Sequence, residues 1–146
     1  MFSECVYEKE FYEIRCRKEG EENMGIIDFH CDTLMCLYDL MATGNHKENL
    51  WQNEGHIDLK RLIESGNLAQ FFACFLWFEG KPVKESFYQD ALAMCELLKS
   101  EIAEHSEAAA LAGNYREYLK NKENGKFSAF LTVEEGGILE NKLERL

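Results

Sequence analysis

Residues 68–78, Leu-Ala-Gln-Phe-Phe-Ala-Cys-Phe-Leu-Trp-Phe, form a long and strongly apolar run. Its aromatic side chains and its lack of polar alternation favour a strand that is buried on both faces. Two shorter apolar runs, at 25–31 and 127–133, are further candidate strands. Helical patterns follow all three runs, which predicts an α/β fold with a parallel sheet built as a βα series.

The predicted helices rest on apolar spacing and on capping residues. Helical spacing covers 33–41 and 84–105, and Asp58 is a candidate N-cap for a helix over 59–65. Asn114 is a candidate cap for a short helix that extends to residue 122, and a further helix is predicted from Ile138 onward.

The two ends of the sequence differ from its middle. Residues 1–23 show little periodicity, and we expect either a poorly ordered extension or misread upstream codons before a true start at Met24. Near the other end, Leu139, Leu143 and Leu146 keep helical spacing where the sequence stops. Three parallel strands also leave two exposed sheet edges, so we expect residues 24–146 to be part of a larger α/β protein.

Composition excludes several classes of partner. The chain has 146 residues and a formal net charge of −11, from 27 acidic and 16 basic residues. A strongly acidic chain without a basic stripe disfavours nucleic acid and anionic membrane as partners. We find neither an apolar run of roughly 20 residues nor an apolar leader, since glutamates are scattered through residues 4–13. We therefore expect a cytoplasmic protein.

Six cysteines, at positions 5, 16, 31, 36, 74 and 95, form no Cys-x-x-Cys pair. This spacing does not favour a structural zinc knuckle. In a chain that is not secreted, we expect all six to be reduced thiols.

A candidate metal site follows the first predicted strand. His30 and Asp32 are two residues apart, so strand alternation places both on one face, with Asp28 on the same face. An imidazole and a carboxylate at the C-terminal end of a strand suit a divalent metal ion. The alternative is structural: His30 would be a hydrogen-bonded core residue and Asp32 the N-cap of the next helix.

The same tripeptide pattern recurs at His56-Ile57-Asp58. This copy follows a polar loop rather than a strand, and Asp58 has a capping role. We therefore interpret the second copy as structural.

Glu135 is the third candidate ligand. It follows the strand over 127–133 and precedes Gly136-Gly137, where the backbone can approach closely. Alternation places Glu135 on the face of Val133 and directs Glu134 to the opposite face. A carboxylate at the same end of a neighbouring strand could bridge two metal ions. By itself, Glu-Glu-Gly-Gly is more often a plain loop.

Together these motifs resemble those of the membrane (renal) dipeptidases, zinc peptidases with a (β/α)8 barrel. The resemblance rests on Ile27-Asp28-Phe29-His30-Cys31-Asp32, on residues 56–62 with Gly66 and 70–72, and on Thr132-Val133-Glu134-Glu135-Gly136-Gly137. The motifs occur in the family's order and cover about Gly25 to Leu146. The chain would then hold about the first three βα units of a TIM-type barrel.

The resemblance implies a centre with two Zn²⁺ ions in the full-length protein. His30 and Asp32 would bind the first ion, Glu135 would bridge both, and Asp28 would orient a ligand. The substrate would be a dipeptide and the full-length enzyme a homodimer. The family's other ligands and acid/base groups lie further along its chain, so we expect the 146-residue piece to be inactive alone.

Two other interpretations stay open. The chain could be a stand-alone α/β remnant that acts as a non-catalytic binding protein, and such a protein should bind little zinc. It could also belong to another class of metal hydrolase barrel. Those more often open with His-x-His, so Asp32 argues against this class.

Overall fold

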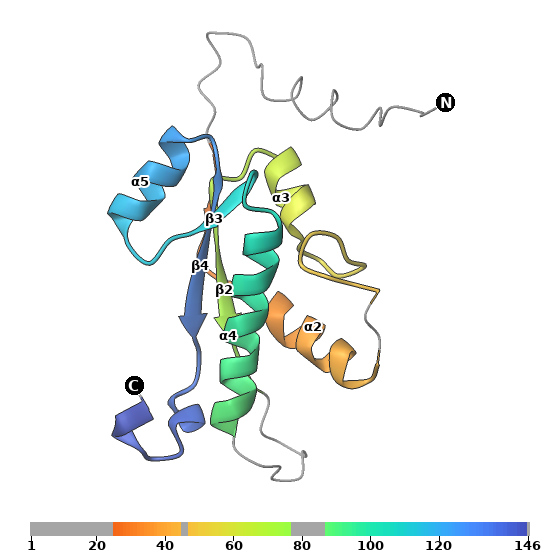
Figure 1. The fold of residues 1–146 in the computed structure, drawn as a ribbon, viewed down its shortest axis with the longest axis vertical. Helices are drawn as coiled ribbons and strands as arrows, with labels where there is room; N and C mark the ends of the chain where they lie inside the picture. The colour runs from red at the N-terminus through yellow and green to blue at the C-terminus, as the bar shows by residue number, and fades with distance from the viewer. Residues whose placement is uncertain (1–24, 45–46, 77–86, 146) are drawn as a thin grey trace, which may run out of the picture.

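The computed structural model describes residues 25–44, 47–76 and 87–145. Within them, four parallel strands form one sheet in the order β1-β2-β4-β3 (Figure 1). The strands are β1 (Ile27–Asp28), β2 (Ala69–Cys74), β3 (Ala109–Leu111) and β4 (Phe127–Val133), and the helices are α2 (Thr33–Ala42), α3 (Leu59–Glu64), α4 (Phe87–Glu104) and α5 (Tyr115–Glu123). The predicted α/β class with a parallel sheet is confirmed.

Strand β2 lies between β1 and β4. It pairs with β4 along its whole length, from Ala69 opposite Ser128 to Cys74 opposite Val133. All of its residues are buried except Phe71, which is half-buried. The prediction of a buried strand is therefore confirmed for residues 69–74 of the apolar run. Residues 77 and 78 of the run lie outside the described residues.

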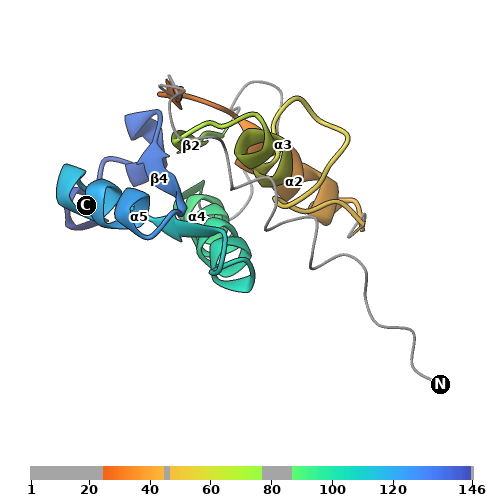
Figure 2. The ribbon, with the colours of Figure 1, turned by 90° about the horizontal axis from the view of Figure 1, so that it is seen from above.

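Two apolar clusters hold the helices against the sheet. The larger cluster joins α2 and α4 to β2 and β4, and it includes Leu34, Phe72 and Leu98. The smaller cluster brings Tyr118 of α5 against Ala69 of β2. Because Phe72 and Ala69 have opposite parity in the strand, the clusters lie on opposite faces of the sheet. Figure 2 shows α2 and α5 on different sides of β2 and β4.

Both predicted N-caps are present. The carboxylate of Asp58 accepts a hydrogen bond from the backbone N–H of Arg61 at 2.8 Å, and α3 begins at the next residue, Leu59. The side chain of Asn114 accepts from the backbone N–H of Glu117 at 3.1 Å, where α5 begins. The helix predicted over 84–105 is α4, and residues 84–86 lie outside the described residues.

Strand β3 was not among the strands predicted from the sequence. It has only three residues, Ala-Ala-Leu, and alanine has a low preference for strands. The strand forms because Ala109–Leu111 pairs with the first half of β4, opposite Phe127–Ala129. Tertiary pairing, rather than local preference, therefore decides this segment, and the described sheet has four strands instead of the three predicted.

The α-helix predicted from Ile138 is also wrong. Two short 3₁₀ helices, Gly136–Leu139 and Leu143–Arg145, take its place. Glu140 and Asn141 between them have φ values of 52° and 59°, in the left-handed region. A right-handed α-helix cannot continue through two such residues, so the leucine spacing here does not produce one.

In the described part of the chain, no helix is both long and apolar enough to cross a membrane. The extension predicted at 1–23, with Cys5 and Cys16, lies outside the described residues.

Candidate metal centre

Strands β1 and β4 flank β2 and point the same way, so their C-terminal ends reach the same edge of the sheet. Backbone hydrogen bonds continue past the strand ends on both sides of β2. Ala73 N donates to Cys31 O at 3.0 Å, and Glu134 N donates to Cys74 O at 3.2 Å. The end of β2 therefore holds in place the two segments that carry the candidate side chains.

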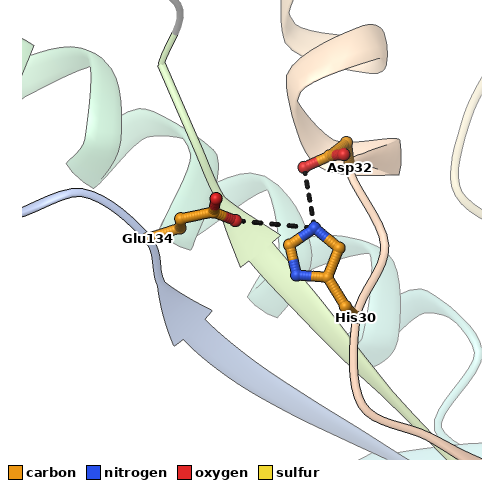
Figure 3. A group of neighbouring side chains, drawn as sticks. All are labelled: His30, Asp32 and Glu134. Atoms are coloured by element: carbon orange, nitrogen blue, oxygen red, sulfur yellow. Dashed lines mark hydrogen bonds and ion pairs between the residues drawn. The ribbon is translucent and has the colours of Figure 1, made fainter.

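Three polar side chains meet at this edge. His30 Nε2 lies 3.2 Å from Asp32 Oδ1 and 3.5 Å from Glu134 Oε2 (Figure 3). One ligand atom from each residue lies within 4.8 Å of the others. The three side chains are 51%, 45% and 49% exposed, so the cluster is open to solvent and to an incoming ion.

The structural alternative for His30 and Asp32 does not fit this geometry. His30 is exposed and therefore is not a core histidine. Asp32 occupies the N-cap position of α2, but its side chain makes no capping hydrogen bond. Its carboxylate faces the His30 ring instead. Both side chains are thus available for a ligand.

Asp28 and Cys31 contribute differently to this segment. The carboxylate of Asp28 accepts from the backbone N–H of His30 at 3.2 Å, so it fixes the main chain rather than the imidazole. Cys31 points into the core between α2 and β2. Burial raises the pKa of its thiol. Cys31 is not part of the candidate ligand cluster.

The two adjacent glutamates lie differently from what alternation predicts. Glu134, expected on the opposite face, is the carboxylate near His30. Glu135 has a φ of 79°, and its Oε1 accepts from Gly137 N at 3.1 Å. Glu134 was missed because its direction depends on the β4 register: its amide continues the ladder to Cys74, and the turn comes only at Glu135.

The donor set fits a divalent metal ion. One imidazole nitrogen and two carboxylate oxygens are the ligand types that zinc takes in open sites with free coordination positions. The cluster also carries more negative than positive charge, because two carboxylates face a single imidazole. A bound cation would offset this excess.

Comparison with solved structures shows which known fold this chain resembles. A crystal structure described as a dipeptidase and metallopeptidase of family M19 shares the fold, with a TM-score of 0.61 and 21% sequence identity. The alignment covers 77% of this chain and 37% of that chain, so the present chain spans well under half of the solved dipeptidase. No curated protein matches the sequence.

The family comparison covers most of the sequence. The model of the membrane dipeptidase family (peptidase family M19) matches residues 17–146, a range that includes every element described above. The start of the match lies inside the segment predicted as an extension. Because this match covers most of the sequence, the chain belongs to the membrane dipeptidase family.

Proposed function

We propose that the whole protein carrying this chain is a zinc-dependent dipeptidase, and that this chain supplies part of its metal centre. The observation that carries the proposal is the meeting of His30, Asp32 and Glu134 at the C-terminal edge of the sheet. Membership of a dipeptidase family supports peptide bond hydrolysis as the reaction.

His30 and Asp32 are the proposed ligands of one Zn²⁺, and Glu135 is the proposed bridge to a second. The backbone of Glu135 supports a functional role, because a non-glycine residue at φ 79° costs about 1–3 kcal/mol. Such strain gathers at functional sites. Glu134 is the competing ligand, because its carboxylate lies nearer to His30.

When bound, zinc would polarise the scissile carbonyl and favour ionisation of the attacking water. The residues of this chain orient the ligands. Asp28 fixes the main chain at His30, and the end of β2 fixes both Cys31 and Glu134 through their backbones. The backbone next to the proposed ligands is therefore held by hydrogen bonds and is not a free loop, which favours a preorganised site.

The direct test uses the whole protein with a panel of dipeptides and matched tripeptides. We expect dipeptide hydrolysis that is lost on dialysis against a chelator and restored by Zn²⁺. Tripeptides should be poor substrates, as the dipeptidase assignment requires. Hydrolysis that persists in the chelated protein, or a preference for tripeptides, would contradict the proposal.

A cytoplasmic location and a homodimeric assembly remain predictions from the sequence and from the family resemblance.

A further inference from the structure

Two thiols lie close together between the end of β2 and helix α4. Cys74 is the last residue of β2 and Cys95 is in α4, and their sulfur atoms are 3.6 Å apart. Cys74 is fully buried, whereas Cys95 is partly exposed. A disulfide needs a sulfur separation of about 2.05 Å, so a small side-chain movement would bring the two into bonding range.

The other cysteines in the described ranges differ from this pair. Cys31 is buried and Cys36 is exposed on α2. Only Cys74 and Cys95, among the described cysteines, have sulfur atoms within hydrogen-bond distance of each other. The pair combines one thiol that solvent can reach with one that it cannot.

We propose that Cys74 and Cys95 form a reversible disulfide when the folded protein meets hydrogen peroxide. Cys95 is the thiol that reacts first, because solvent reaches it, and Cys74 is the resolving thiol. This inference does not rest on the proposed dipeptidase activity.

The reaction balances in two steps. The Cys95 thiolate attacks one peroxide oxygen, the O–O bond breaks, and the released hydroxide takes a proton to become water. The Cys74 sulfur then attacks the sulfenic sulfur of Cys95, the S–O bond breaks, and the hydroxide leaves with the Cys74 proton as a second water. Overall, two thiols lose two electrons and one peroxide becomes two waters.

The electrostatic surroundings agree with this order of reaction. The hydrogen bond from the Cys74 thiol, with help from the nearby Lys99 ammonium, lowers the pKa of Cys95 to about 7. The same hydrogen bond, together with burial, raises the pKa of Cys74. Cys95 is therefore the thiol with more thiolate at neutral pH, and the thiolate is the form that peroxide oxidises.

A disulfide here would tie α4 to the strand end beside the candidate metal centre. The carbonyl of Cys74 accepts the N–H of Glu134, whose carboxylate lies near His30. The oxidised link would thus restrain the part of the backbone that carries Glu134.

The test treats the reduced, folded chain with equimolar hydrogen peroxide, blocks the remaining thiols with N-ethylmaleimide and maps tryptic peptides by mass spectrometry. Cleavage after Lys84 separates the two cysteines, so their disulfide appears as two cross-linked peptides. We expect this species to be the main oxidised product and to disappear after reduction with dithiothreitol.

Three variants and an unfolded control complete the experiment. Cys95→Ser should abolish the cross-link, whereas Cys36→Ser, which removes an exposed thiol, should retain it. Cys74→Ala should leave Cys95 as a sulfenic acid that dimedone traps. Should a variant fail to fold by circular dichroism, the wild-type peptide map decides alone. Equal cross-linking in urea-unfolded chain, or Cys95 oxidised to sulfinic acid without a cross-link, would overturn the proposal.

Discussion

The two His-x-Asp copies in this chain have the same pattern and opposite environments. In His30-Cys31-Asp32, the two polar side chains are about half exposed and lie 3.2 Å apart. In His56-Ile57-Asp58, the aspartate side chain is only 2% exposed and its Oδ2 accepts from Arg61 Nε at 2.7 Å, while His56 is exposed. The first copy presents ligands to solvent, and the second uses its carboxylate for structure.

The difference comes from position rather than from residue type. Both aspartates precede a helix, yet Asp58 caps α3 and Asp32 makes no capping hydrogen bond in α2. The first copy directly follows a strand whose end is held by the β2 backbone, next to the end of β4. A His-x-Asp tripeptide therefore becomes a candidate site only where the sheet brings a third polar side chain to it.

The largest expected effect separates the two histidines. His30→Ala in the whole protein should lower dipeptide hydrolysis about 10³-fold or more, because loss of a ligand removes several kcal/mol of metal stabilisation in the transition state. His56→Ala, the matched control, should keep wild-type kcat/KM. Equal losses in the two variants would remove the distinction between the copies.

The next effect concerns the two glutamates after β4. Glu135→Ala should also abolish hydrolysis, because the proposed bridge between the ions is lost. Glu134→Gln should weaken zinc binding by about tenfold, the size expected when a supporting group is lost. Hydrolysis rates and zinc titrations of both variants distinguish the roles. Full activity in Glu135→Ala, with none in Glu134→Gln, would assign the ligand to Glu134 instead.

For stability, the second His-x-Asp copy should matter more than the first, so Asp58 and Asp32 should differ in the opposite sense to the two histidines. Asp58→Ala should lower the free energy of unfolding by about 2–4 kcal/mol, because it removes the cap of α3 and the other hydrogen bonds that the buried Asp58 carboxylate accepts. Asp32→Ala should change it by no more than about 0.5 kcal/mol, since its side chain is half exposed and caps nothing. Urea denaturation of both variants measures the contrast, and a larger loss in Asp32→Ala would refute it.

The partner of Asp58 should show a smaller loss of stability than Asp58 itself. Arg61→Met should cost about 1 kcal/mol in urea denaturation, because the arginine side chain is 49% exposed and solvent screens its charge. In this variant the carboxylate of Asp58 still caps α3, because it accepts its hydrogen bond from the backbone N–H of residue 61. A loss as large as that of Asp58→Ala would show that the side-chain ion pair, rather than the cap, holds this copy.

The structure could be predicted from the sequence wherever local chemistry decides it. The apolar run of β2, the caps at Asp58 and Asn114 and the α/β alternation are all visible in it. The structure could not be predicted from the sequence where long-range strand pairing or an unusual backbone conformation decides it. Strand β3 exists because β4 pairs with it, and the turn at Glu135 requires a positive φ that no local pattern indicates.

In the candidate site, too, one contact could be predicted from the sequence and another could not. That His30 and Asp32 meet follows from their spacing after a strand, and the structure places them together. The approach of Glu134 to His30 depends on the register between β2 and β4, which a single sequence does not reveal.

The most direct test of the central claim is a zinc competition titration of this chain with a chromogenic chelator, comparing wild type, His30→Ala and His56→Ala. We expect His30→Ala to lower zinc affinity by at least about tenfold and His56→Ala to leave it unchanged. Equal zinc affinity in wild type and His30→Ala would contradict the assignment of the first His-x-Asp copy to a metal centre.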